Sequence, residues 1–194
     1  ALEKLGSKAI FVSADLADPH AAQHVVDAAD SAFGALHVLV NAAGLTDRGT
    51  ILDTSLERFD ELFAVNVRAP FFLTQGAVKI MVREGITGSI INIASVLGLR
   101  QAGRVLPYAV SKAGLVQMTK LLALEWARHS IRVNAIAPGY FATDINAEFW
   151  GTPLGQAIVK RVPTRRLGEL QDLDGPLLLL ASDASRHMTG AVLE

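Results

Sequence analysis

The stretch that decides the fold is residues 89–137, SIINIASVLGLRQAGRVLPYAVSKAGLVQMTKLLALEWARHSIRVNAIA. It begins with the apolar run Ser89–Ala94 and ends with a second apolar run, Ile131–Ala137. Both runs are short and rich in β-branched residues, which is typical of buried strands. Between them, Pro107 suits the first turn of a helix that reaches about Arg128. A strand, a long helix and a second strand predict two parallel strands in one sheet.

The rest of the chain continues this alternation of strands and helices. We expect further strands at Ala9–Ser13, His37–Asn41 and Ala191–Glu194. We expect further helices from Asp18 and Pro19 to Phe33, from Ser55 to Arg83, within residues 144–161 and from Asp172 to Ser182, and the end of another helix over residues 2–6. Pro70 predicts a kink near Arg68 in the longest of these. The expected fold class is α/β, with residues 1–194 forming a single Rossmann-type domain around a doubly wound parallel sheet.

Composition argues against several classes of function. The chain is 51% hydrophobic and 19% charged, which suits a globular domain with a substantial core. The absence of cysteine excludes disulfides, zinc-thiolate sites and a cysteine nucleophile. The net charge is −1 and the charges are scattered, so we expect no nucleic-acid partner. The longest aliphatic run, Leu177–Ala181, is too short to cross a bilayer, so we expect no membrane partner. We also expect a cytoplasmic protein, since the lack of cysteine is compatible with a reducing compartment.

Histidine spacing gives one weak metal signal. His20 and His24 are one helical turn apart near a predicted helix start. No third ligand accompanies them, so we interpret them as a surface pair and expect no metal site.

Three residues in the deciding stretch carry acid–base chemistry. Tyr108 and Lys112 are four residues apart, which places them on one helical face. A nearby ammonium group favours the phenolate, so it would bring the tyrosine toward a useful acid–base range. Ser95 lies at the carboxyl end of a predicted strand, where ligands bind in open α/β sheets. The alternative is a solvated Tyr–Lys pair and an ordinary turn serine.

These positions resemble the motifs of the short-chain dehydrogenase/reductase family, and the match runs along essentially the whole chain. The matching residues are Asp15 followed by Leu16, the element Asn41-Ala42-Ala43-Gly44, the catalytic set Asn66, Ser95, Tyr108 and Lys112, and the turn Pro138-Gly139 with Thr143 downstream. Each motif alone is weak, but together they are specific because they occur in the family's order at compatible spacings.

The resemblance implies an NAD- or NADP-dependent oxidoreductase that interconverts a carbonyl and a secondary alcohol. Tyr108 would exchange the proton, and Lys112 would lower the pKa of Tyr108 and hold the nicotinamide ribose. Ser95 would bind the substrate oxygen, and Asn66 would bind a water that links Lys112 to solvent. The cofactor would lie against Asp15, Leu16, Asn41, Ala42, Ala43, Gly44, Tyr108, Lys112, Pro138, Gly139 and Thr143.

The sequence departs from the family pattern near both ends. It contains no Thr-Gly-x-x-x-Gly-x-Gly turn, whose helix binds pyrophosphate in the family, and no Val-Asp-Gly-Gly-like segment, which in the family usually follows the last strand. We therefore expect the family's first two strands to be absent and one edge of the sheet to be unpaired. The 194 residues produced alone are expected to bind nicotinamide cofactors poorly and to aggregate. The choice between NAD and NADP stays open.

The substrate also stays open among sugar acids and polyols, 3-oxoacyl thioesters and small cyclic alcohols, with a preference for the first group on resemblance. Residues 140–170 would form a substrate lid, and Phe141, Phe149 and Trp150 indicate a partly apolar pocket. The three residues between Tyr108 and Lys112 resemble carbonyl reductases more than enoyl reductases. Arg100 or Arg104 could contact an anionic group.

Three alternatives to this enzyme remain: a catalytically inactive fragment, a family-derived binding protein, and a lyase or epimerase on the same fold. The resemblance also implies a homo-oligomer, a dimer or tetramer. Its interface would use apolar residues of two helices, which core packing explains equally well: Phe71, Phe72, Leu121 and Leu122.

Overall fold

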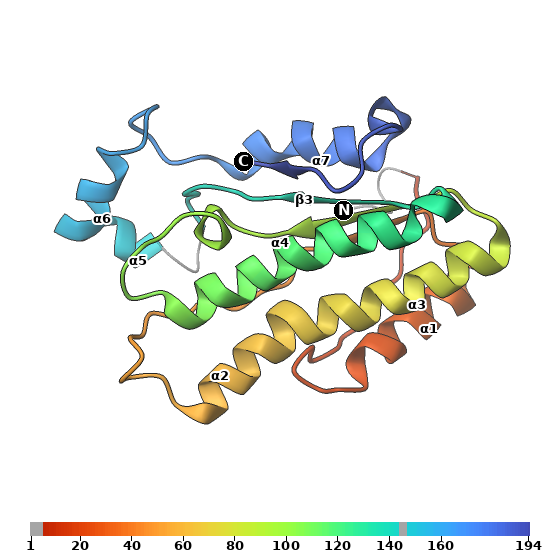
Figure 1. The fold of residues 1–194 in the computed structure, drawn as a ribbon, viewed down its shortest axis with the longest axis horizontal. Coiled ribbons are helices and arrows are strands. Elements are labelled where there is room, and N and C mark those ends of the chain that lie inside the picture. Colours follow the sequence, from red (N-terminus) through yellow and green to blue (C-terminus); the bar gives the residue numbers. More distant parts are fainter. Residues whose placement is uncertain (1–5, 144–146) are drawn as a thin grey trace.

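The computed structural model describes residues 6–143 and 147–194, and its centre is a four-stranded sheet (Figure 1). The strands are β1 (Val38–Asn41), β2 (Ser89–Ile93), β3 (Arg132–Ile136) and β4 (Val192–Leu193). They lie in the order β1-β2-β3-β4, and every neighbouring pair is parallel. The helices between successive strands are the crossovers that parallel pairing requires. The expected α/β fold class is therefore confirmed.

Helices pack on both sides of this sheet. They are α1 (Ala21–Phe33), α2 (Leu56–Phe63), α3 (Ala69–Glu84), α4 (Leu106–Trp126), α5 (Ala147–Trp150), α6 (Pro153–Val159) and α7 (Asp174–Ala181), with a π-helical turn η2 (Ala64–Arg68) and a 3-10 turn η3 (Val96–Gly98). Further 3-10 turns occupy Ala127–His129, Leu170–Leu173 and Asp183–Ser185. In Figure 1, α7 lies on one side of the strands, and α1, α3 and α4 lie on the other. The expected helix end over residues 2–6 lies, except for Gly6, outside the described residues.

Successive strand residues bury their side chains on opposite faces of the sheet. Ile90 of β2 packs with Val133 of β3 and Met81 of α3. Its neighbour Ile91 packs with Leu180 of α7 on the other face. Both faces of the sheet are therefore covered, as a doubly wound fold requires.

The prediction of a strand at Ala9–Ser13 is wrong. No strand is formed there, and Phe11 is 92% exposed. A strand exists through hydrogen bonds to a neighbour, and β1 pairs only with β2 among the described residues. This leaves the other edge of β1 unpaired in the described part of the chain, as expected.

The long helix predicted between Ser55 and Arg83 forms as α2, η2 and α3 without an intervening loop. Ser55 caps its start, since its hydroxyl accepts a hydrogen bond of 3.2 Å from the Arg58 N–H. Pro70 has no N–H and so cannot donate to a carbonyl of the preceding turn. The helix widens just before it, where the Ala69 N–H bonds to the Ala64 oxygen five residues back. The predicted irregularity is confirmed, and Asn66 lies inside it.

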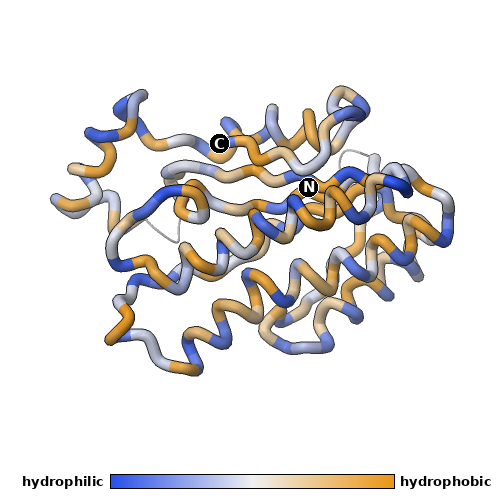
Figure 2. The backbone as a smooth tube through the Cα atoms, viewed as in Figure 1, coloured by the Kyte–Doolittle hydropathy of each residue, from blue (hydrophilic) through white to orange (hydrophobic). Residues whose placement is uncertain are grey.

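Apolar residues recur along the whole length of α3 and α4 (Figure 2). Several face solvent: Phe71, Phe72 and Leu121 are 44–57% exposed, and Leu124 is 80% exposed. Leu122, by contrast, packs against the core. Within residues 6–143 and 147–194, no helix combines the length and the hydropathy that a membrane-spanning segment needs.

Candidate active site

The candidate active site lies at the carboxyl ends of three adjacent strands. In the register of the sheet, Asn41 of β1 pairs with Asn92 of β2, and Asn92 pairs with Ala135 of β3. Ser95 follows β2, and the turn at Pro138 follows β3. Because parallel strands end at the same edge of a sheet, the predicted strand-end residues meet there.

Lys112 is a buried cation on the α4 face that Tyr108 shares. Its side chain is almost fully buried, at 4% exposure, and its Nζ donates a 2.8 Å hydrogen bond to the Ile93 carbonyl. No carboxylate of a described residue lies within ion-pair distance of it. Burial therefore lowers the pKa of Lys112 to about 8. Its Nζ lies 5.9 Å from the centre of the Tyr108 ring.

The pKa of Tyr108 is raised, which is opposite to the direction expected from the sequence. Burial of the phenol disfavours its charged form, and a side-chain hydrogen bond with Ser95 acts in the other direction without overcoming it. The Lys112 ammonium group, 5.9 Å from the centre of the ring, does not reverse the rise.

Ser95 is fixed at the junction of β2 and η3. Its hydroxyl accepts a 3.1 Å hydrogen bond from the Leu97 N–H and so caps η3. The next residue, Val96, donates its N–H to the Pro138 carbonyl at 3.0 Å. The strand ends of β2 and β3 are thus joined by a hydrogen bond at the residue next to Ser95.

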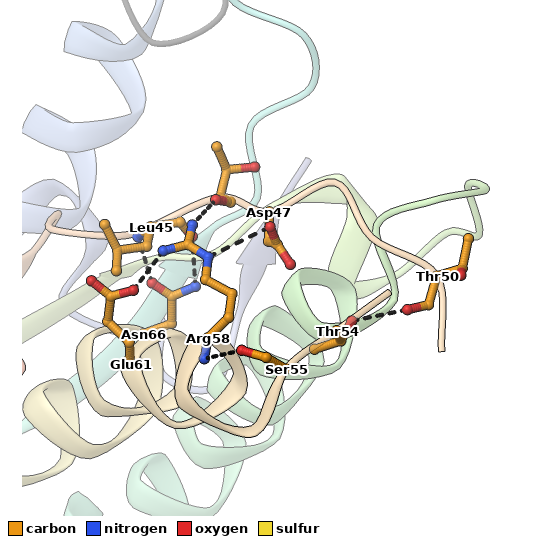
Figure 3. Close-up of polar contacts among 9 residues, drawn as sticks. Leu45, Asp47, Thr50, Thr54, Ser55, Arg58, Glu61 and Asn66 are labelled. Atoms are coloured by element: carbon orange, nitrogen blue, oxygen red, sulfur yellow. Dashed lines mark hydrogen bonds and ion pairs between the residues drawn. The ribbon is translucent and has the colours of Figure 1, made fainter. Parts of the chain in front are cut away.

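Asn66 ties the segment after β1 to α4. Its side-chain oxygen accepts from the Leu45 N–H at 2.8 Å, and its amide nitrogen donates to the Leu45 carbonyl at 2.9 Å and to the Ser111 hydroxyl at 3.0 Å. Figure 3 shows this pairing with Leu45 beside Arg58. Because the side chain is committed to protein groups, a water at Asn66 would use its backbone carbonyl. Pro70, four residues on, cannot supply that carbonyl with its usual helical donor.

Gly44 lies close to the Lys112 ammonium group and to the Asn66 side chain. A Cβ at Gly44 would lie 3.2 Å from the Lys112 Nζ and 3.3 Å from the Asn66 side-chain oxygen. Both contacts are tight, so a side chain here would crowd the ammonium group. The small residues predicted at this strand end therefore have a steric reason.

A pocket of about 210 Å³ lies beside the end of β1. Four of the predicted cofactor residues line it, namely Leu16, Asn41, Ala42 and Ala43, and its other walls are apolar. Asp15 is not part of the lining. Its carboxylate accepts a 2.9 Å hydrogen bond from the Ala17 N–H and so caps a turn.

Asn41, which lines this pocket, has a buried side-chain acceptor. The Thr119 hydroxyl donates to the Leu115 carbonyl, so its oxygen accepts from the Asn92 amide at 2.9 Å. The Asn92 oxygen in turn accepts from the Asn41 amide at 2.8 Å. This leaves the Asn41 Oδ1 without a partner among the described residues. Buried acceptors are seldom unpaired, so this oxygen marks a hydrogen bond that the described residues leave unmade.

Arg48 bridges two segments across the site, and no sequence motif pointed to it. Its guanidinium lies 3.3 Å from the centre of the Phe149 ring. Phe149 packs against Trp150, which also contacts Tyr140. Arg48 follows β1 and Phe149 follows β3, so their contact joins the segments that leave these two strands. Among the described residues, no carboxylate lies within ion-pair distance of Arg48.

Arg100 and Arg104 are not part of this arrangement. The Arg100 guanidinium pairs with the Glu194 carboxylate at 2.7 Å. Both arginines line a second pocket of about 480 Å³, which neither Tyr108 nor Lys112 lines. The structure therefore does not support the expectation that one of them meets the substrate.

The described residues fit the nicotinamide end of NAD or NADP. The Lys112 ammonium uses one of its three donors on Ile93, which leaves two for ribose hydroxyls. The small residues from Ala42 to Gly44 are exposed, so a flat ring can reach their backbone. Among residues 6–143 and 147–194, no group of acidic and histidine side chains could hold a metal ion.

Comparisons with known proteins agree with this geometry. A family model described as enoyl-(acyl carrier protein) reductase matches residues 1–194. The chain is 40% identical over 187 residues to 2-dehydro-3-deoxy-D-gluconate 5-dehydrogenase of Escherichia coli K12, covering 96% of this chain and 74% of that protein. It is 35% identical over 193 residues to L-rhamnose 1-dehydrogenase (NAD(P)(+)) of Sphingomonas sp., covering 99% and 76%.

The fold is also similar to that of a solved sugar-acid dehydrogenase structure. The gluconate 5-dehydrogenase of Burkholderia cenocepacia J2315, in complex with NADP and tartrate, superposes with a TM-score of 0.93 at 30% identity, over 99% of this chain and 75% of that chain. Fold, site and relatives agree, and the chain belongs to the short-chain dehydrogenase/reductase family of NAD(P)-dependent oxidoreductases.

Proposed function

We propose that this protein interconverts a secondary alcohol and a ketone on a sugar acid or related polyol. The observation that carries the proposal is the meeting of three groups at one strand edge: Ser95 at the end of β2, and Tyr108 and Lys112 on one face of α4, with the Lys112 Nζ 5.9 Å from the centre of the Tyr108 ring. The bound nicotinamide supplies the hydride chemistry. The chain's own residues orient the substrate oxygen and manage its proton.

In this mechanism Ser95 donates a hydrogen bond to the substrate oxygen and stabilises charge that develops there. Tyr108 takes the hydroxyl proton when an alcohol is oxidised and returns a proton when a ketone is reduced. Lys112 donates to the nicotinamide ribose, and its charge favours the phenolate once the site is filled. A water on the Asn66 carbonyl connects Lys112 to solvent. Asp15, Leu16, Asn41, Ala42, Ala43, Gly44, Pro138, Gly139 and Thr143 hold the cofactor.

The assay that tests this activity uses the native protein with a sugar acid, its neutral polyol analogue and either NAD or NADP. We expect reduced nicotinamide and ketone to form together with the acid. Turnover of an enoyl thioester in place of these substrates would favour the activity in the family model's description. Turnover with no net change in the nicotinamide would favour a lyase or epimerase.

The preference for an acid over a neutral polyol rests on Arg48. It is an exposed cation without an ion-pair partner in the described residues, and its contact with Phe149 joins the segments that follow β1 and β3. Phe149 lies within residues 140–170, which we propose as the substrate lid of a single domain covering residues 1–194. A carboxylate that enters beneath this lid meets the guanidinium, which binds it in a planar, two-bond geometry.

We predict that Arg48→Gln raises KM for a sugar acid about 10- to 100-fold, because a hydrogen bond to a charged group is lost. The kcat and the KM for the neutral polyol should stay within about twofold. Arg186→Gln is the matched control, since Arg186 is exposed and precedes β4 at the opposite strand edge. Equal KM changes for acid and polyol would exclude Arg48 from carboxylate recognition.

We further propose that the protein acts in the cytoplasm, where the NAD(P) pools lie, as a homo-oligomer, with a tetramer as the preferred state. The exposed side chains of Phe71, Phe72, Leu121 and Leu124 support a subunit contact along α3 and α4. Sedimentation of the native protein tests this, and a monomer at micromolar concentration would exclude it.

A further inference from the structure

The backbone of η3 lies directly on the backbone of α4, at the residue that supplies the buried cation. A Cβ at Gly98 would lie 2.7 Å from the carbonyl carbon of Lys112 and 2.9 Å from both the Lys112 oxygen and the Ala113 nitrogen. These three atoms are main chain, so they cannot rotate away as a side chain could. The φ angle of Gly98 lies outside the left-handed region. Space, and not backbone conformation, is what demands glycine here.

The position of Gly98 is coupled to that of Ser95 through one tight turn. The Gly98 N–H donates to the Ser95 carbonyl at 2.9 Å, and the Leu97 N–H donates to the Ser95 hydroxyl at 3.1 Å. Both bonds close within the four residues from Ser95 to Gly98, so this turn moves as one unit. A displacement of Gly98 away from α4 therefore moves Ser95 relative to Tyr108, which α4 carries.

We infer that Gly98 is a positioning residue that sets the distance between the Ser95 hydroxyl and the Tyr108 phenol. It does so by allowing η3 to rest on α4 without an intervening side chain. The inference rests on the proposed function, because it assigns to Gly98 the alignment of the two hydroxyls that hold the substrate oxygen. Gly98 touches neither substrate nor cofactor in this scheme and acts through Ser95.

The first test compares Gly98→Ala with Gly103→Ala in the native protein. Gly103 lies in the same connection between β2 and α4, and a Cβ there meets nothing within 4 Å. We expect Gly98→Ala to lower kcat about 10- to 100-fold, as small misplacements of catalytic groups do, and to leave the cofactor Kd within about twofold. Gly103→Ala should match the wild type. Equal kcat values for Gly98→Ala and wild type would overturn the inference.

A double-mutant cycle with Ser95→Ala separates positioning from general damage. If Gly98 acts through Ser95, Gly98→Ala should lower kcat by less than about threefold in the Ser95→Ala background. If the reduction in kcat of the double variant equals the product of the reductions in the two single variants, the inference is contradicted. A Gly98→Ala protein that fails to fold would also contradict it, since that result would make Gly98 a residue of the core and not of the site.

Titration of the phenol provides a readout that needs no turnover. Tyr108 and Tyr140 are the two tyrosines of the sequence, so Tyr140→Phe leaves one phenol whose ionisation is followed by ultraviolet absorbance. The contact with Ser95 lowers the pKa of Tyr108, so its loss in Gly98→Ala should raise that pKa. An unchanged titration would overturn the inference. Failure of the proposed function alone would abolish the kinetic differences and leave this titration shift in place.

Discussion

Replacing Tyr108 with phenylalanine is expected to lower kcat about 1,000- to 10,000-fold. The change removes the one hydroxyl that exchanges a proton with the substrate and keeps the ring that fills the site, and general acid–base groups contribute about this much. The cofactor Kd should change by less than about threefold, because the Lys112 donors remain. Steady-state kinetics and cofactor titration measure the two quantities separately.

The matched control is Tyr140→Phe, which removes the other phenol while keeping its ring against Trp150. It should retain kcat within about twofold. A Tyr108→Phe protein with wild-type kcat would mean that another group exchanges the proton. A large loss in both variants would point to damage in the lid and not to acid–base chemistry.

The second large effect is expected from Lys112→Met, which should lower kcat at least about 100-fold and stabilise the protein at pH 7. In the folded protein the pKa of Lys112 is lowered from 10.5 to about 8, so the buried charge costs about 3 kcal/mol when it is protonated in both states. Methionine removes this cost and loses the hydrogen bond of the charged group to Ile93, worth about 1.5–3 kcal/mol. A net gain of up to about 1.5 kcal/mol in the free energy of unfolding remains.

The stability difference between Lys112→Met and wild type should depend on pH in a defined direction. Below pH 8 both states of the wild type bind the proton, so the full cost of the buried charge is present. Between about pH 8 and 10.5 the folded state releases the proton while the unfolded state keeps it, so wild-type stability rises with pH. The advantage of Lys112→Met in urea unfolding should therefore shrink across this window. Lys120→Met, at an exposed position on the same helix, is the matched control for the removal of a lysine. A Lys112→Met protein less stable than wild type at pH 7 would contradict the account.

Hydrophobic runs and helix signals predicted most of the fold, because each acts over a few residues. The order of strands and helices follows from Pro107 and the short apolar runs, and Pro70 marks the widened turn at η2. The run Ala9–Ser13 has the same local character as the strands that form. It does not pair because a strand also needs a neighbour, and local sequence carries no information about that neighbour.

The acid–base residues were predictable because spacing and strand position place them. Tyr108 and Lys112 share a helical face at four-residue spacing, and Ser95 ends a strand. The direction of the pKa shift at Tyr108 was not predictable, since it depends on how deeply the phenol is buried in the folded protein. Arg48 gave no signal either, because its contact with Phe149 joins segments about a hundred residues apart.

The most direct test of the central claim is to measure ketone and reduced nicotinamide together when the native protein oxidises a sugar acid. If Ser95, Tyr108 and Lys112 form the acid–base centre of an NAD(P)-linked dehydrogenase, the two products should form in equal amounts. The rate should rise with pH as Tyr108 ionises, and both products should disappear together in Tyr108→Phe. Ketone formation without reduced nicotinamide, or equal rates for Tyr108→Phe and wild type, would contradict the account.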